Sequence, residues 1–369
     1  MNRFVLAHGS HQRVPLTIVG GPEGAGKTTL LRQLLTCSDG RRIAVLLDHP
    51  SALGLESSAI SRVRDNSLEL HNGSMCLALD GDIGTALLSL RANRGAALPD
   101  HVVVEAGSSA SLVRMSGYSF LPGLRPGGMI SVVSAPEVAL LREAGAEPDS
   151  ALEAQLQQAE LVVLNHTDGI KAVMRPIVRR WLQQRTARAR VIESERCCIP
   201  AAMILGASIE KAPVHAIHGE WSPGFSIETE SRRNRILQPR HPEDYRAWVL
   251  TTRASVDSSS FRTWVNSLPD SIVRGDGVLR LANERSHRFQ FHHCGLRWSL
   301  SRDEPWGEKE IDPLSWISLV GFAASSSPGR EGKSRDALES VTLSLPSEPP
   351  HFRPPLRRPK SPRSIGELS

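Results

Sequence analysis

The segment from Gly21 to Thr28 combines glycines, a lysine and a hydroxyl side chain at a spacing that suits binding of a phosphate chain. It reads Gly21-Pro22-Glu23-Gly24-Ala25-Gly26-Lys27-Thr28 and is followed by Thr29. Glycines let the backbone curl so that successive N–H groups converge on an anion. Lys27 is then expected to reach the β- and γ-phosphates, and the Thr28 hydroxyl to bind Mg²⁺. The segment therefore predicts a site for a magnesium nucleoside triphosphate rather than a glycine-rich turn that binds nothing.

Two further segments could complete this site. Asn165 and Asp168 follow an apolar run in the order Asn-x-x-Asp, and Glu105 ends another apolar run, Val-Val-Val-Glu. The Asp168 carboxylate would accept hydrogen bonds from N1–H and the exocyclic amine of guanine, a pairing that adenine does not offer, and Asn165 would bond the N7 side. Glu105 would hold the water shell of Mg²⁺. A polar turn and a strand-terminating acid are the alternatives, but the position of both segments at strand ends favours GTP.

The elements that must position these residues alternate along residues 14–205. Helix-like stretches cover Thr28–Leu35, Asp82–Arg91, Pro136–Glu143, Leu152–Ala159 and Val173–Thr186. Short apolar runs predict buried parallel strands at Leu16–Val19, Ile43–Leu47, Val102–Val104, Met129–Val133 and Leu161–Leu164. Strands that alternate with helices imply right-handed crossovers and a doubly wound, mostly parallel α/β sheet. The phosphate-binding segment would join the first strand to the first helix, whose N-terminus adds partial positive charge.

The composition changes after about residue 210, which predicts a second, smaller unit after a P-loop domain at residues 1–210. Residues 211–240 contain Pro, Gly, Ser and clustered Arg and are interpreted as a linker. Residues 241–324 predict a small α+β domain, with strands near Ala247–Thr252, Gly277–Ala282, Arg288–Cys294 and Trp316–Phe322 and a helix at Ser258–Ser267. Residues 325–369 are rich in Pro, Arg and Ser without apolar periodicity, which predicts a disordered tail.

Composition and charge restrict the class of protein. The net charge of +5 and the pI near 9.2 are mildly basic, and the arginines are spread along the chain, which favours a solvated surface over nucleic-acid binding. The five cysteines are odd in number and form no Cys-x-x-Cys pair, as expected in a reducing compartment. No run approaches the roughly 18 apolar residues of a membrane span, and the first residues lack a signal-peptide pattern. We therefore expect a cytoplasmic protein without membrane contact.

Together these motifs resemble the CobW family of P-loop GTPases, relatives of the nickel-insertion GTPases of urease and hydrogenase. The family's nucleotide-binding motifs fall on Gly21–Leu31, Asn72–Leu77, Glu105–Ser108 and Gln155–Asp168, and those of its C-terminal domain fall on Trp264–Pro269 and Arg274–Gly277. The resemblance spans about residues 14 to 322. It implies that the chain binds GTP and GDP with Mg²⁺, hydrolyses GTP, and contacts a client protein through the C-terminal domain as a metal chaperone or regulator.

The chain departs from the family at the metal and switch segments. The family's Cys-x-Cys-Cys presents thiolates to a transition metal, with zinc as the usual candidate. Here Cys76 is the one cysteine left, with Ser74 and Leu77 at the other two positions. His49, after the second predicted strand, is a further imidazole that could approach. The resemblance thus implies Zn²⁺, but a single thiolate cannot build a tetrahedral site, and Cys76 is its one candidate ligand in this motif.

Two functions remain open from the sequence. The first is a slow GTPase that acts as a metal chaperone or client regulator, with Lys27, Thr28 and Glu105 as the catalytic residues and no evident arginine finger. The second is a nucleotide-dependent switch or scaffold that has lost its metal cargo and efficient hydrolysis, which the eroded cysteine motif favours. The intact phosphate loop and the Asn165–Asp168 segment favour the first. A small-molecule kinase is disfavoured because no lid segment is apparent.

Overall fold

The computed structural model describes residues 13–37, 40–48, 53–64, 67–79, 83–92, 99–107, 110–186, 189–206, 245–268, 272–307 and 313–322. The predicted linker at 211–240, the predicted tail at 325–369 and His49 lie outside these ranges. Within them, no helix has both the length and the apolar character needed to cross a membrane.

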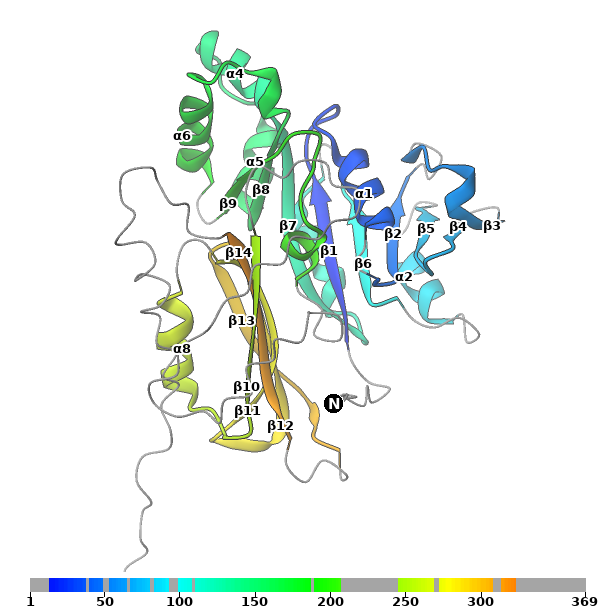
Figure 1. Ribbon diagram of the computed structural model, residues 1–369, viewed down its shortest axis with the longest axis vertical. Helices are drawn as coiled ribbons and strands as arrows, with labels where there is room; N and C mark the ends of the chain where they lie inside the picture. Colours follow the sequence, from blue (N-terminus) through cyan, green and yellow to red (C-terminus); the bar gives the residue numbers. More distant parts are fainter. Residues whose placement is uncertain are drawn as a thin grey trace, which may run out of the picture.

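A nine-stranded sheet forms the larger unit (Figure 1), in the order β3-β4-β5-β2-β6-β1-β7-β8-β9. The parallel strands are β1 (Val14–Gly20), β2 (Ile43–Leu47), β5 (Met75–Ala78), β6 (His101–Glu105), β7 (Leu124–Ser134), β8 (Leu161–Asn165) and β9 (Arg190–Glu193). An antiparallel hairpin of β3 (Ile60–Arg64) and β4 (Ser67–Leu70) extends the sheet beyond β5. The predicted doubly wound, mostly parallel sheet is confirmed, and the hairpin is an addition to it.

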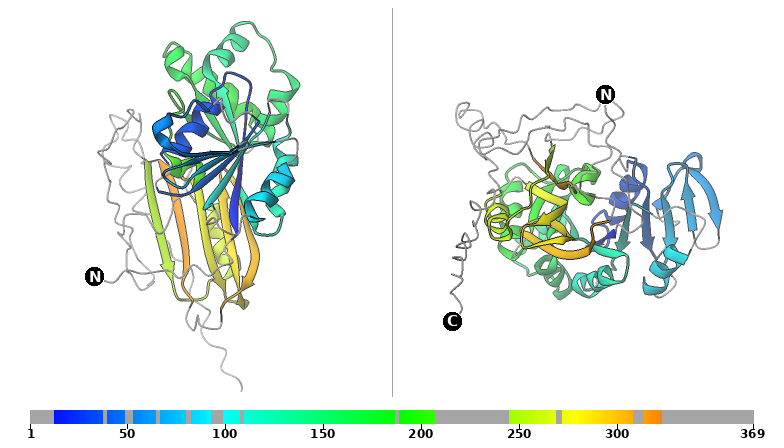
Figure 2. Two further views of the ribbon diagram at one scale, coloured as in Figure 1. Left: turned by 90° about the vertical axis from the view of Figure 1, so that its right-hand side faces the viewer. Right: turned by 90° about the horizontal axis from the view of Figure 1, so that it is seen from below.

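Helices cover both faces of this sheet (Figure 2). They are α1 (Lys27–Thr36), α2 (Ile83–Ala92), α3 (Leu112–Ser116), α4 (Ala135–Glu143), α5 (Ser150–Gln158), α6 (Arg175–Arg185) and α7 (Ala201–Leu205). Neighbouring residues of one strand lie in different cores: Val19 packs in the cluster that holds α1 and α7, and Ile18 in the cluster that holds α2 to α6. Strands buried on both faces are near-continuous apolar runs, which is why β1, β2, β6, β7 and β8 could be predicted from the sequence. The short, partly exposed strands β5 and β9 were not predicted.

The smaller unit is a five-stranded antiparallel sheet in the order β10-β14-β11-β12-β13. Its elements are β10 (Tyr245–Thr252), α8 (Ser258–Asn266), β11 (Ile272–Leu281), β12 (Glu284–Cys294), β13 (Arg297–Pro305) and β14 (Ser315–Phe322). Helix α8 covers one face, where Phe261 packs edge-on against Phe291 at 5.2 Å between ring centroids. The other face presents Val273 and Val320 to α7, so that the predicted second α+β domain shares part of a core with the first.

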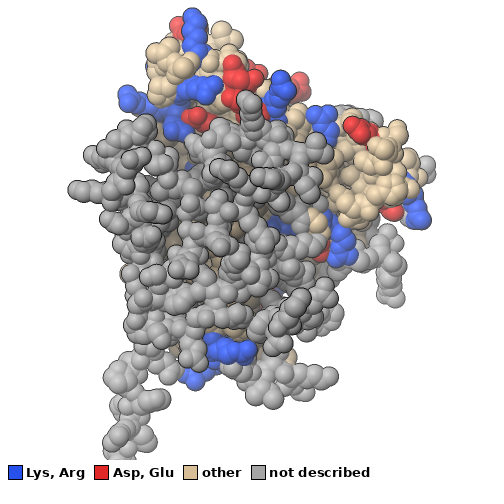
Figure 3. All heavy atoms as spheres, in the orientation of Figure 1, with Lys and Arg blue, Asp and Glu red and all other residues tan. Residues whose placement is uncertain are grey.

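Charged side chains of both signs lie on the surface around α4 and α6 (Figure 3). Arg185 of α6 illustrates the arrangement, since its guanidinium contacts Glu147 and lies 3.6 Å from Glu153. The surface at this end of the molecule is therefore of mixed charge.

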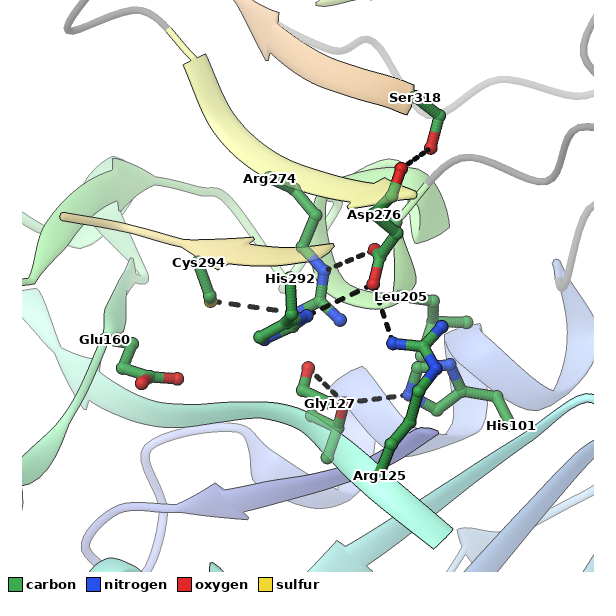
Figure 4. A network of polar contacts seen from close by, with 12 residues as sticks. His101, Arg125, Gly127, Glu160, Leu205, Arg274, Asp276, His292, Cys294 and Ser318 are labelled. Carbon is green, nitrogen blue, oxygen red and sulfur yellow. Dashed lines mark hydrogen bonds and ion pairs between the residues drawn. The ribbon is translucent and has the colours of Figure 1, made fainter. Parts of the chain in front are cut away.

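A buried ion network joins the two units (Figure 4). Arg125 of β7 donates from Nη1 to Oδ1 of Asp276 on β11 at 2.9 Å, and Nδ1 of His292 on β12 lies 3.1 Å from the same oxygen. Nε of Arg274 is 3.5 Å from the other carboxylate oxygen. Burial by itself would raise the pKa of Asp276, but the charges of Arg125 and Arg274 and the hydrogen bond with His292 outweigh it and hold the pKa well below its usual range. An ionised Asp276 therefore fixes the second sheet against the start of β7.

We expect Asp276→Asn to lower the free energy of unfolding by about 3 kcal/mol at neutral pH, because two guanidinium groups would then be buried without their carboxylate. Urea denaturation of the full chain measures this. A group whose folded-state pKa is depressed stabilises the fold above its unfolded-state pKa and loses that effect as the pH falls. The difference between wild type and variant should therefore shrink below about pH 4.

Asp100→Asn is the matched control, since Asp100 pairs with Arg42 at 2.9 Å and both side chains are more than a third exposed. Exposed ion pairs contribute at most about 1 kcal/mol. Equal losses in the two variants would show that the buried network does not hold the sheets together.

Candidate functional site

Two glycines of the phosphate loop sit where a side chain would collide with neighbouring elements. Gly21 has a φ of +140°, and a Cβ there would lie 2.1 Å from the carbonyl oxygen of Val132 on β7. Gly26 has a φ of +107°, and its Cβ would lie 2.4 Å from Nδ2 of Asn165 on β8. Both positions thus require glycine for conformation and for space. The loop is seated on the carboxyl ends of β7 and β8, where an α/β sheet binds its ligands.

Helix α1 starts directly from this loop. Gly26 is its N-cap residue, and no side chain caps the first turn. The first N–H groups of a helix have no intrahelical acceptor, so an anion is their natural partner. Thr28 is the second residue of α1, and its predicted contact with Mg²⁺ stays a prediction.

The ammonium group of Lys27 is held across the loop. Nζ donates to the carbonyl oxygens of Gly21 at 2.8 Å and Pro22 at 2.9 Å. Burial lowers the pKa of Lys27, and the charges of Glu105, Glu23 and Glu137 act in the opposite direction. The lysine therefore has two neutral acceptors and nearby carboxylates, and a phosphate oxygen would supply a charged acceptor at the same place.

Glu105 is the last residue of β6, and Asp48 directly follows the neighbouring parallel strand β2 at the same edge of the sheet. Burial raises the pKa of Glu105, Lys27 lowers it, and the negative charge of Asp48 raises it further. Carboxylate oxygens that repel each other are the ligands that a hard divalent cation prefers. These residues fit Mg²⁺, and Asp48 joins Thr28 and Glu105 as a candidate. The sequence analysis did not assign Asp48 to magnesium, although its place directly after β2 is a signal that could have done so.

Asn165 connects three segments of the site. Its Nδ2 donates to the carbonyl oxygen of Ala25 at 3.0 Å, and its Oδ1 accepts from the backbone N–H of Cys197 at 2.7 Å. The side chain is fully buried. Asn165 therefore holds the phosphate loop against the loop that follows β9, a role that sequence reasoning missed. Its predicted contact with guanine stays a prediction.

Asp168 lies in the short 3-10 turn Thr167–Gly169 that follows β8, and its side chain is exposed. The preceding residue, His166, has a left-handed backbone with φ of 59°, and its Nδ1 lies 3.5 Å from Oγ of Ser134. The backbone N–H of Thr167 donates to the carbonyl oxygen of Ser194 at 3.2 Å. The turn is thus tied to both neighbouring strands while the Asp168 carboxylate remains open to a base.

The loop after β9 is a part of the site that no sequence motif predicted. Arg196 and Cys197 both have positive φ values, 53° and 54°. The Cys197 thiol donates to the carbonyl oxygen of Gly26 at 3.3 Å, and Gln33 of α1 donates to the carbonyl oxygen of Arg196 at 2.9 Å. Burial raises the pKa of Cys197 to about 12, which keeps the thiol protonated as a donor. The loop therefore packs on the phosphate loop and on α1 at once.

The segment of the eroded cysteine motif forms β5 and the residues before it. Oγ of Ser74 accepts from the backbone N–H of Ile43 at 3.1 Å and donates to the carbonyl oxygen of Arg41 at 3.4 Å. Cys76 is fully buried in the α1 core, and burial, with a contribution from Glu105, raises its pKa to about 12. Leu77 packs in the core on the other face of the sheet. In the described ranges, no three His, Cys, Asp or Glu side chains are placed to hold a metal ion. Zinc at Cys76 stays a prediction.

The structure brings Lys27, Glu105 and Asn165 to one edge of the sheet, because β1, β6 and β8 run parallel and their carboxyl ends meet there. Asp168 follows three residues after Asn165. Cys76 lies on the same sheet but within its core. The arrangement offers a phosphate chain the start of α1 and the Lys27 ammonium, with the Glu105 carboxylate at the same edge of the sheet.

Family models match both units of the chain. The model described as CobW/HypB/UreG, nucleotide-binding domain, matches residues 15–193. The model described as cobalamin synthesis protein cobW C-terminal domain matches residues 245–335.

Several curated proteins are similar to this chain. The zinc chaperone CobW of Sinorhizobium sp is 30% identical over 344 residues, which covers 83% of this chain and 92% of that protein. The zinc-regulated GTPase metalloprotein activator 1 of Schizosaccharomyces pombe is 28% identical and covers 49% of this chain and 46% of its own length. Among solved structures, the Zn(II)-bound YjiA GTPase of Escherichia coli is 21% identical with a TM-score of 0.39, and the match covers 84% of this chain and 95% of that chain.

Proposed function

Because this chain belongs to the CobW family of P-loop GTPases, we propose that it binds GTP with Mg²⁺, hydrolyses GTP slowly, and acts on a client protein as a metal chaperone or regulator. The observation that carries this proposal is the Lys27 ammonium, held across the phosphate loop at 2.8 and 2.9 Å from two carbonyl oxygens next to a helix N-terminus without a side-chain cap. Relatives that are named zinc chaperones and a zinc-regulated GTPase support the metal-chaperone class.

Each residue of the site has a part in this proposal. Lys27 and the N–H groups of the loop bind the phosphates, and Asp168 binds the guanine edge. Thr28 and Glu105, with Asp48, would hold Mg²⁺, which neutralises phosphate charge. The sequence shows no evident arginine finger, so in this proposal Lys27 and the cation supply the positive charge at the phosphates. Slow hydrolysis follows, because an arginine that stabilises the transition state contributes about 10³- to 10⁵-fold in rate.

Binding and hydrolysis measured on the full chain test the proposal. We expect tight binding of GTP and GDP in the presence of Mg²⁺, and slow phosphate release that Glu105→Gln reduces further. A protein that binds neither nucleotide, or that hydrolyses ATP as well as GTP, would contradict the proposed function.

A second candidate is a nucleotide-dependent switch or scaffold without metal cargo. The observation in its favour is the placement of Ser74 and Cys76. The Ser74 hydroxyl is used in hydrogen bonds to the backbone around β2, and the Cys76 thiol is fully buried with a raised pKa. A thiolate must be reached by the ion that it binds, and the Cys76 side chain is fully buried in the α1 core.

We expect the purified protein to carry no stoichiometric zinc, and GTP hydrolysis to change by less than about threefold on addition of free Zn²⁺, because tight sites need about four ligands and this motif has one thiol. Metal analysis of the purified chain and hydrolysis assays with and without Zn²⁺ measure both. Cys76→Ser should leave them unchanged, as should Cys37→Ser at an exposed cysteine. One equivalent of zinc bound at nanomolar affinity, and lost in Cys76→Ser alone, would instead assign the cargo site to this segment.

A further inference from the structure

The backbone that follows Glu105 is held by a glutamine of α5. Nε2 of Gln155 donates to the carbonyl oxygen of Gly107 at 3.2 Å and to that of Ala110 at 3.1 Å. The backbone N–H of Ala110 also donates to the carbonyl oxygen of Gly107, at 3.0 Å. Gln155 is 1% exposed, so its amide group is itself shielded from water, whereas the acceptors belong to an exposed Gly107 and a half-buried Ala110. The buried amide group of Gln155 therefore fixes the carbonyls of Gly107 and Ala110 relative to each other. Gly107 is two residues after Glu105, the proposed magnesium ligand.

The next turn of the same helix holds the far end of this backbone. Oε1 of Gln158 accepts from the backbone N–H of Val113 and from the Ser111 hydroxyl, both at 3.1 Å. Residues three apart on a helix lie on the same side, so Gln155 and Gln158 act on one stretch of chain. Helix α5 is itself capped, since Oδ1 of Asp149 accepts from the N–H of Leu152 at 2.7 Å. Helix α5 is thus bonded to Gly107 and Ala110 through Gln155, and to Ser111 and Val113 through Gln158.

Gln155 also adjoins the strand that leads into the phosphate loop. A Cβ placed on Gly20, the residue before Gly21, would lie 3.4 Å from both Cδ and Oε1 of Gln155. At the same level, the backbone N–H of Ala106 donates to the carbonyl oxygen of Val19 at 2.8 Å. Gln155 therefore lies between the last residue of β1 and the chain that continues from Glu105.

We propose that Gln155 is a positioning residue for GTP hydrolysis, which rests on the function proposed above. Its amide fixes the backbone after Glu105 relative to the phosphate loop, and it acts through that backbone rather than on the nucleotide. Hydrolysis depends on the placement of groups around the terminal phosphate, where an error of about 1 Å costs on the order of 100-fold in rate. Binding of GDP depends instead on Lys27, the loop and Asp168. A change at Gln155 should therefore reduce the hydrolysis rate and leave the affinity for GDP intact.

Two substitutions test this in the full chain. Gln155→Met keeps the length of the side chain and removes both donor bonds, and Gln155→Glu replaces the donor with an oxygen that repels two carbonyls. For both we expect single-turnover GTP hydrolysis to fall about 10- to 100-fold, with the affinity for GDP within about threefold of wild type. Gln157→Met is the matched control, because Gln157 is an exposed glutamine of the same helix that bonds Glu153 instead. It should match wild type in both measurements.

The outcomes separate this inference from the proposed function. Unchanged hydrolysis in both Gln155 variants overturns the positioning role and leaves the GTPase assignment standing. Equal loss of GDP affinity and hydrolysis also overturns it, since that result marks a residue needed for the fold of the site. A wild-type protein that binds GTP but never hydrolyses it overturns the proposed enzymatic function itself, and the positioning role with it.

Discussion

Lys27→Ala is expected to abolish detectable binding of GTP and GDP while the chain remains folded. Each hydrogen bond to a charged group contributes about 1.5–3 kcal/mol, so the loss of two such contacts to phosphate weakens binding by at least about 100-fold. The bonds that Lys27 makes within the protein are to carbonyls of its own loop, at 2.8 and 2.9 Å. We therefore expect the unfolding midpoint without nucleotide to change little. Equilibrium titration with a fluorescent GTP analogue and urea denaturation measure the two effects.

Arg62→Ala is the control for simple loss of positive charge. Arg62 lies on the edge strand β3 with a side chain 59% exposed, and it faces Glu69 rather than the phosphate loop. Its removal should leave nucleotide affinity within about twofold, since exposed charges act weakly at a distance. Retained micromolar affinity in Lys27→Ala would mean that the loop from Gly21 to Thr28 is not the phosphate site.

Asp168 should impose a preference for GTP over ATP of about 10³- to 10⁵-fold. The carboxylate accepts hydrogen bonds from N1–H and the exocyclic amine of guanine, but it faces the acceptor N1 when adenine is bound. A mismatch of polar groups of this kind lowers the affinity for the wrong base by a factor of this size. Asp168→Asn should weaken GTP binding and raise affinity for xanthosine triphosphate, because the new amide can donate to the second carbonyl oxygen of xanthine. Competition among the three nucleotides on wild type and variant measures the exchange.

Because Asp168 is exposed, the substitution removes no buried contact, and we expect it to change nucleotide binding without changing the fold. Glu143→Gln, at an exposed acid near the end of α4, is the matched control and should keep the preference for GTP. Equal affinity of the wild type for ATP and GTP would contradict the assignment of Asn165 and Asp168 to base recognition.

The sequence alone determined the structure of those segments whose interacting residues lie close together along the chain. A strand, a glycine-rich loop and a helix follow one another within residues 14–36, so the phosphate loop could be predicted from its own residues. The central parallel strands β1, β2, β6, β7 and β8 could be predicted because burial on both faces makes each a continuous apolar run. The parallel strands β5 and β9 are short and partly exposed, and the sequence analysis missed them. Ile43–Leu47 was predicted with the bounds that the structure gives it.

Elements with mixed patterns were not predictable in this way. The hairpin of β3 and β4 is short and half exposed, and β13 is polar along most of its length. Their hydrogen bonds come from pairing with strands elsewhere in the chain, so the local sequence carries little of the signal that forms them.

Only the tertiary structure decided which side chains support the site. Asn165 was recognised as a base-recognition candidate, yet its hydrogen bonds go to Ala25 and Cys197, which lie 140 and 32 residues away. Arg125 and Asp276 meet across 151 residues, and Gln155 reaches a carbonyl 48 residues away. No local pattern encodes such pairs, because they form when separate strands and helices pack and bury polar groups that must then find partners. The sequence by itself determined that this protein can hold a nucleotide, and the packing of distant elements decided which residues place the backbone around it.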